Sequence, residues 1–78
     1  MPLLMLADKY TYRVLWSAED GEFVGLCAEF PSLSWLGKSR EAAVAGIVGV
    51  VRQVVREMER AHETPPIPLA DKQPPASS

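Results

Sequence analysis

Hydrophobic and polar residues alternate in the first third of the chain, from Tyr10 to Ser17, interrupted only by Leu15. The apolar side of this alternation is formed by Tyr12, Val14 and Trp16. A period of two residues is typical of a half-buried β-strand. The sequence Glu19-Asp20-Gly21-Glu22 follows, and it predicts a tight turn because glycine accepts a positive φ without steric cost.

The next segment, Phe23 to Phe30, is apolar in both phases, which predicts a strand in the centre of the sheet beside the first one. Two registers of the hairpin remain open. A three-residue loop with Gly21 in the left-handed conformation places one set of residues on a common face. That set is Tyr12, Val14, Trp16, Val24, Leu26 and Ala28. A two-residue loop instead pairs Trp16 with Gly25.

Pro31 cannot donate a ladder hydrogen bond, so the second strand is expected to end at Phe30. A short third strand is predicted over Ser34 to Lys38, and Ser39 is a good N-cap for the helix that follows. From Arg40 to about His62, apolar residues recur at helical spacing and polar residues fill the other side. The apolar residues are Val44, Ile47, Val48, Val51, Val55 and Met58. Gly46 and Gly49 are expected to let this helix approach the sheet closely.

The pattern therefore predicts an α+β fold, a two-layer β-β-β-α(-β) module in which one long helix packs on one face of an antiparallel sheet. The sheet has three or four strands, because Ile67 and Leu69 form either a brief fourth edge strand or a packed extended segment. Residues 10–69 are expected to form the single domain. Residues 1–9 form a frayed or packed leader in which Met5 is an alternative start to Met1, and the proline-rich residues 70–78 form a disordered tail.

Size and charge narrow the functional classes. A chain of 78 residues has a marginal core, so a homodimer or tetramer is expected. The formal net charge is -2, whereas a nucleic-acid-binding surface is usually basic, so the charge does not indicate nucleic-acid binding. The single cysteine, Cys27, fits a reducing cytoplasm, and the apolar start of the chain is too short for an export signal or a membrane span.

Catalytic chemistry has few candidates. Cysteine and histidine lack metal-ligand spacing, and the glycines do not form a phosphate loop. His62 is expected to cap the helix or lie in solvent, and Cys27 to be an unreactive core residue with a raised pKa. We therefore predict a protein that is not an enzyme and that binds neither a cofactor nor a metal.

Four carboxylates are candidates for contact with a basic partner protein. Glu19, Asp20 and Glu22 cluster on the hairpin, and Glu29 lies farther along the chain. A solvated turn is the alternative interpretation of this cluster.

Several fragments in order resemble the HicB antitoxin family. They are the aromatic strand Tyr10 to Trp16, the Asp20-Gly21 turn, the strand from Phe23 to Pro31, the junction Gly37-Lys38-Ser39-Arg40-Glu41-Ala42 and the sequence Pro66-Ile67-Pro68. The match covers about three quarters of the chain. Two features depart from the family pattern: position 32 is Ser where Gly is common, and a DNA-binding motif does not follow Leu69, so direct DNA binding by this chain is not expected.

The resemblance implies a partial ribonuclease H-like fold, a cytoplasmic location, self-association and an antitoxin role. In that role the chain binds a small basic HicA-type mRNA interferase and keeps its catalytic surface from RNA. Two alternatives are an oligomeric scaffold of the same fold without a toxin and, with less support, a small metal-dependent nuclease. Fold analogy alone does not confer nuclease activity.

Overall fold

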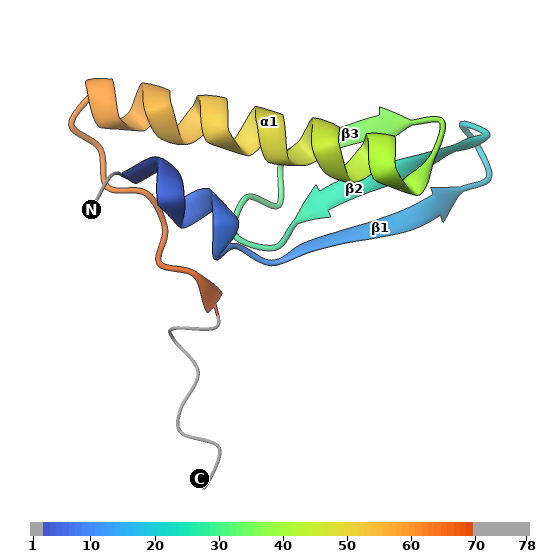
Figure 1. Cartoon of the computed structure of the whole chain (residues 1–78), viewed down its shortest axis with the longest axis horizontal. Helices are drawn as coiled ribbons and strands as arrows, with labels where there is room; N and C mark the ends of the chain where they lie inside the picture. The colour runs from blue at the N-terminus through green and yellow to red at the C-terminus, as the bar shows by residue number, and fades with distance from the viewer. Residues whose placement is uncertain (1–2, 70–78) are drawn as a thin grey trace, which may run out of the picture.

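The computed structural model describes residues 3–69 and has two layers, a three-stranded sheet and a long helix across one of its faces (Figure 1). The elements in chain order are the 3-10 helix η1 (Leu3–Asp8), the strands β1 (Tyr12–Ser17), β2 (Glu22–Cys27) and β3 (Ser34–Gly37), and the helix α1 (Arg40–Arg60). The sheet is antiparallel in the order β1-β2-β3, so β2 is central. The predicted α+β fold class is confirmed.

The hairpin register differs from both registers that the sequence suggests. Trp16 lies opposite Phe23 and Val14 lies opposite Gly25, which leaves a four-residue loop, residues 18–21. Gly21 does adopt the left-handed conformation, with φ of 64°, and its amide donates to the carbonyl of Ser17 at 2.9 Å. The Ser17 hydroxyl also donates to Asp20 Oδ2 at 2.8 Å. These two bonds stabilise the longer loop. The common face predicted for Val14, Val24 and Leu26 is wrong, because in the observed register Val14 lies opposite Gly25 and shares its side of the sheet, whereas Val24 and Leu26 lie on the other side.

The second strand ends at Cys27 rather than at Phe30. The chain turns there, since Phe30 donates its amide to the Cys27 carbonyl at 3.1 Å and Leu33 donates to the Phe30 carbonyl at 3.0 Å. Within the described residues, the segment after α1 forms no fourth strand, and it packs through its prolines while Ile67 is 55% exposed and Leu69 is 40% exposed. Pro65 and Pro68 are buried in it, and the Tyr10 hydroxyl donates to the Pro66 carbonyl at 2.8 Å.

Both ends of α1 are capped by the local sequence. The Ser39 hydroxyl accepts from the Ala42 amide at 3.0 Å, which confirms the predicted N-cap. At the other end His62 has φ of 60°, a left-handed conformation, and donates its amide to the Glu59 carbonyl. Glu63 donates to the Met58 carbonyl at 2.8 Å, which completes a Schellman motif. The backbone of His62 thus terminates the helix, while its side chain is exposed.

The core lies between α1 and the sheet, where the backbone of α1 approaches the backbones of β2 and β3 very closely. Its fully buried helix residues are Ala43, Ile47, Val51 and Val55. A methyl group added at Gly25 would collide with the Ala43 carbonyl oxygen, and one at Gly37 would lie 2.6 Å from the Ala43 amide nitrogen. The small residues of β2 and β3 therefore face the helix, and the branched residues of β2 face away from it.

Gly46 and Gly49 differ in their surroundings. The Trp35 indole of β3 packs directly on Gly46, where a side chain would collide with the ring, so the expected close approach is confirmed there. An added methyl at Gly49 meets open space, so the same expectation is wrong for Gly49.

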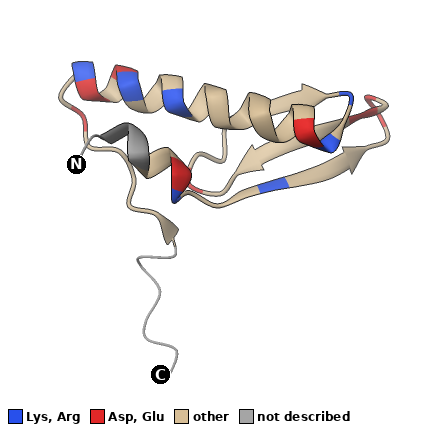
Figure 2. Cartoon of the chain, viewed as in Figure 1, with Lys and Arg blue, Asp and Glu red and all other residues tan. Residues whose placement is uncertain are grey.

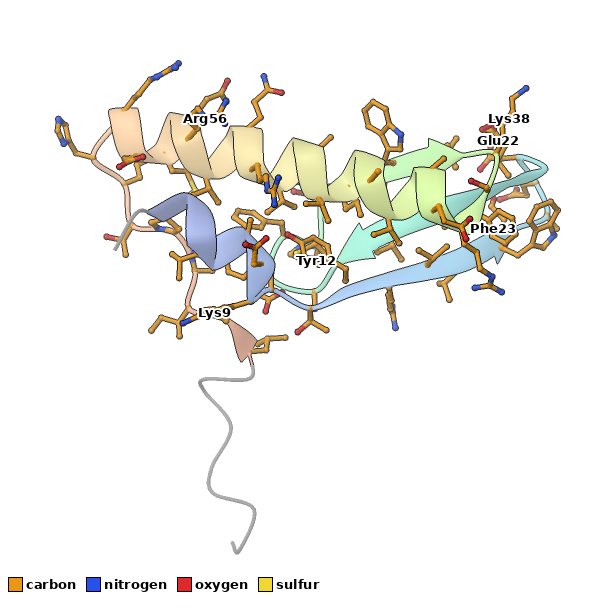
Figure 3. All side chains as sticks on the ribbon, viewed as in Figure 1. Lys9, Tyr12, Glu22, Phe23, Lys38 and Arg56 are labelled. Atoms are coloured by element: carbon orange, nitrogen blue, oxygen red, sulfur yellow. The ribbon has the colours of Figure 1, made fainter. Side chains whose placement is uncertain are left out.

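The N-terminal residues 3–8 form η1, which packs beside α1. Ala7 of this segment is fully buried, and Asp8 accepts a hydrogen bond from Arg52 at 3.0 Å. The Tyr12 hydroxyl donates to the Ala7 carbonyl at 2.7 Å, so η1 covers the first part of β1, and Figure 3 shows Tyr12 in this region. The expected disordered tail, residues 70–78, lies outside the described residues. In residues 3–69 every helix is too short or too polar to cross a membrane.

Candidate protein-binding surfaces

The side of the sheet opposite α1 carries an apolar surface. Strand alternation places Leu15 of β1, Val24 and Leu26 of β2 and Leu36 of β3 on this side, since their neighbours in sequence face the helix. Leu15 is 48% exposed and Leu36 is 43% exposed. Within residues 3–69 the sheet packs against helical structure only on its other side (Figure 1). We call these four residues the open sheet face.

Polar side chains frame the open sheet face at both ends of the strands. Arg13 lies opposite Leu26 at one end, and Ser17 lies opposite Glu22 at the other. Figure 3 shows Glu22, Phe23 and Lys38 together at the hairpin end of the molecule. An apolar centre with a polar rim is the usual composition of a protein-protein interface.

The structure keeps three of the four predicted partner-binding carboxylates together. Glu19 and Asp20 are exposed in the loop between β1 and β2, and Glu22 is half-buried at the start of β2. Figure 2 shows acidic residues at this loop. The cluster borders one end of the open sheet face, so a basic group of a partner on that face would lie close to it.

Glu29 lies at the opposite end of the sheet, apart from the hairpin acids. Its carboxylate accepts hydrogen bonds from the backbone amides of Thr11 and Leu69, both at 2.8 Å. The Thr11 hydroxyl donates to it at 3.4 Å and the Cys27 thiol at 3.5 Å. The carboxylate thus joins the residue before β1, the end of β2 and the segment after α1. We call this arrangement the Glu29 clasp.

The pKa of Glu29 reflects the balance of two effects. Partial burial raises the pKa, but the hydrogen bonds from Leu69 and Thr11 favour the ionised form more strongly, and the net direction is downward. Because the folded-state pKa is below that of the unfolded chain, the clasp stabilises the fold fully above the ordinary glutamate pKa. The contribution is lost as the pH falls through the folded-state value.

Replacing Glu29 with Gln should therefore lower the free energy of unfolding by about 1 kcal/mol at pH 7, because hydrogen bonds to a charged acceptor become neutral ones. The difference between Glu29→Gln and the native protein should shrink as the pH falls below about 4. Urea unfolding at pH 7 and pH 3 measures this. Glu19→Gln in the exposed loop is the matched control and should change stability little at either pH. A loss in Glu29→Gln that is equal at both pH values would contradict the clasp.

Cys27 and the two tyrosines near it belong to the core. Cys27 is 2% exposed, and burial raises the pKa of its thiol, as predicted from the sequence. Burial likewise raises the pKa of Tyr10 and of Tyr12, whose hydroxyls donate to backbone carbonyls. These groups hold elements together and keep their protons at neutral pH. In residues 3–69, groups of three or more His, Cys, Asp or Glu side chains that could hold a metal ion do not occur.

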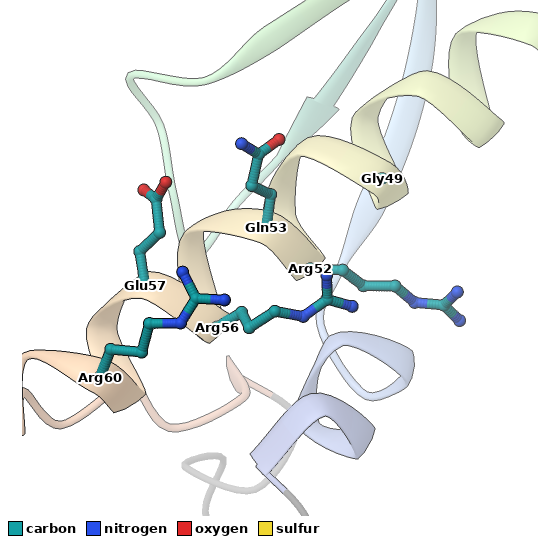
Figure 4. Close-up of a pocket in the computed structure, with 6 residues that line it drawn as sticks. All are labelled: Gly49, Arg52, Gln53, Arg56, Glu57 and Arg60. Carbon is teal, nitrogen blue, oxygen red and sulfur yellow. The ribbon is translucent and has the colours of Figure 1, made fainter.

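A row of arginines follows the outer side of α1 near its C-terminus. Arg52, Arg56 and Arg60 are spaced by four residues and line a shallow hollow of about 370 Å³, together with Gly49, Gln53 and Glu57 (Figure 4). Arg52 forms an ion pair with Asp8 at 3.0 Å, and a carboxylate, Glu57, lies in the same hollow. The row is thus partly neutralised by acidic neighbours.

Two features of these surfaces were missed from the sequence. The open sheet face was missed because the predicted hairpin register was wrong. The sequence signal that could have revealed it is the pair Gly25 and Gly37, which both lie on the helix side of the sheet and so place the branched residues on the other side. The Glu29 clasp was missed because its donors lie 18 and 40 residues away in the chain. The arginine row has an i, i+4, i+8 spacing and lies among the polar residues expected on the other side of the helix.

Comparison with known proteins adds no assignment, since no family model, no curated protein and no solved structure matches the chain.

Proposed function

We propose that this chain is an antitoxin-like binding protein, which sequesters a small basic HicA-type mRNA interferase by protein-protein contact in the cytoplasm. The observation that carries the proposal is the open sheet face, an apolar surface on one side of the sheet with a polar rim. The order of β1, β2, β3 and α1 agrees with the module that the resemblance implies.

The composition of the open sheet face supports protein binding. Four branched apolar side chains lie in adjacent positions on three strands, and two of them are more than two fifths exposed. Burying apolar surface is favourable by about 25 cal/mol per Å², so a partner that covers these residues gains this free energy on binding.

Charge supports a basic partner. The acidic loop, Glu19 and Asp20 with Glu22 at the start of β2, borders the face and would attract cations on the incoming protein. Surface charges of this kind chiefly raise the association rate, so the acidic loop would steer a basic toxin toward the adjoining apolar surface.

The test is co-expression with a small basic protein encoded beside this chain, followed by measurement of complex formation and of RNA cleavage. Leu36→Asp places a charge on the β3 side of the open sheet face and should weaken binding by roughly tenfold or more, because a buried unpaired carboxylate is costly. RNA cleavage should then be restored. Ile67→Asp is the matched control, since Ile67 is also an exposed apolar residue, at 55%, but lies on the segment after α1.

Equal binding by the native protein and Leu36→Asp would show that the partner contacts another surface. A native protein that binds no neighbouring basic protein, or that cleaves RNA itself in the presence of metal ions, would overturn the proposal.

A further inference from the structure

The free edge of β1 lacks most of the features that normally prevent strand pairing, and Arg13 is its one charged residue. β1 is six residues long and contains neither proline, lysine nor glycine (Tyr12–Ser17, sequence YRVLWS). Its helix side is apolar throughout, and its open side carries Leu15 between Arg13 and Ser17. Natural edge strands are usually short, interrupted or charged, because an open edge invites another strand. The other edge, β3, has only four residues and ends in a glycine just before α1. β1 is therefore the edge that is available for pairing.

The backbone groups that β1 presents at this edge follow from the register. Ala28 donates its amide to the Thr11 carbonyl at 2.9 Å, so positions 11, 13, 15 and 17 direct their groups toward β2. The alternate positions, which include Val14 and Trp16, direct theirs outward. Among residues 3–69, hydrogen bonds outside the sheet ladders and the helices do not involve the backbone of Val14 or Trp16.

Side chains beside this edge are also uncovered. α1 packs most closely on Gly25 of β2 and Gly37 of β3, and it contacts β1 less extensively. Trp16 on the helix side of β1 is 57% exposed, although its ring contacts Phe23 edge to face at 5.1 Å between centroids. Apolar surface thus flanks the free edge on the helix side, and Leu15 flanks it on the other.

We propose that β1 pairs with β1 of a second copy of this chain, antiparallel about a two-fold axis at Leu15. Val14 then lies opposite Trp16 of the second copy, and these are the positions whose backbone groups point outward. Leu15 lies opposite its own equivalent on the open side of the sheet. Directly opposite residues have Cβ atoms about 5 Å apart, so these apolar pairs contact each other.

Charge complementarity favours a second copy over an unrelated strand. In the same register Arg13 lies opposite Ser17 of the second copy, and the Ser17 hydroxyl is bonded to the Asp20 carboxylate at 2.8 Å. The guanidinium of Arg13 therefore comes within reach of Asp20 of the second copy, and the symmetry makes this contact twice. The one ion pair among residues 3–69 is that of Arg52 with Asp8, so Arg13 has no carboxylate partner among the described residues of its own chain.

Pairing of this kind extends the proposed binding surface. The two three-stranded sheets become one six-stranded sheet, and the two open sheet faces become continuous on one side of it. This inference rests on the geometry of β1 and not on the toxin partner, so it is tested on the purified full chain alone.

Light scattering and sedimentation measure the mass of the native protein over a range of concentrations. The expected mass at high concentration is twice the 8.6 kDa of one chain, with a dissociation constant in the micromolar range, roughly as for other small interfaces. Amide hydrogen exchange should show protection of Val14 and Trp16 that increases with concentration. The amides of Ser34 and Leu36, which face outward on β3, are the matched control and should not change.

Charge reversal tests the register without depending on stability. Arg13→Asp and Asp20→Arg each place like charges together at both symmetric contacts, so each variant should dimerise at least roughly tenfold more weakly than the native protein. When the two variants are mixed, both contacts again join opposite charges, and the dimer should return. The recovery on mixing shows that each variant is folded.

A native protein that stays monomeric at about millimolar concentration would overturn the proposal, as would protection of Val14 and Trp16 that appears only when a basic partner protein is added. Variants that dimerise as well as the native protein, or a mixture that stays monomeric, would overturn the proposed pairing. Binding of the toxin by Leu36→Asp or by the native protein is measured separately, so the two proposals fail independently.

Discussion

Gly25→Ala is expected to lower the free energy of unfolding by about 3 kcal/mol or more. The added methyl group would collide with the carbonyl oxygen of Ala43 and would lie 2.9 Å from Ile47 Cγ2. The first obstacle is helix backbone, which cannot move aside as the end of a flexible side chain does, so α1 must separate from the sheet. A domain of this size has a total stability of about 4–12 kcal/mol, so a substantial part of it is lost. Thermal or urea unfolding measures the change.

Gly49→Ala is the matched control for Gly25→Ala. It adds the same methyl group at a glycine of α1 where the space around the added group is open. Alanine also favours helix by about 1 kcal/mol relative to glycine. We expect Gly49→Ala to raise the free energy of unfolding by about that amount. If the two substitutions change stability in the same direction, the close contact of α1 with β2 is wrong.

Ile47→Ala should cost about 2–5 kcal/mol, the usual range for removing a large aliphatic side chain from a fully packed position. Ile47 is fully buried, packs over Gly25, and is among the largest of the completely buried side chains. The core is small and close to backbone on both sides, so neighbouring groups have little freedom to fill the space. Urea unfolding with comparison of m-values distinguishes lost stability from a change in the unfolded state.

Val44→Ala is the comparison for Ile47→Ala, one turn earlier on the same helix. Val44 is 39% exposed, and alanine has the better helix propensity, so the net cost should be below about 1 kcal/mol. Equal losses for the two substitutions would show that the buried side of α1 is not the one described.

The order of the elements was predictable because each has a local signal. The alternation before Ser17, the Asp20-Gly21 turn and the Ser39 cap determined three strands and a helix to within a few residues. The register was not predictable, because the loop gains an extra residue through the contact of Ser17 with Asp20. The choice of buried face was also misjudged. Branched residues on β2 were expected to face inward, whereas the close approach of α1 requires glycine there.

The candidate surfaces were predictable only in part. The acidic residues of the hairpin are adjacent in sequence, so their proximity needed no structure. The open sheet face combines residues from three strands and depends on the register, and the Glu29 clasp depends on contacts between distant segments. On α1, the helical spacing of large apolar residues predicts that Val44 is on the buried side, but Val44 is 39% exposed and its neighbour Ala43 is fully buried. Small residues at close contacts carry little hydrophobic signal.

The contact of Trp35 with Gly46 fixes the position of α1 along its own axis. If the helix moved by one turn, about 5.4 Å, the indole would meet Ala42 or Val50 instead of the glycine. Either side chain would crowd the ring, so the indole favours the observed alignment of α1 on β3. A protein that binds Leu36 on one side of the sheet and a molecule that contacts the arginine row on the other would therefore act on two elements whose alignment this contact favours.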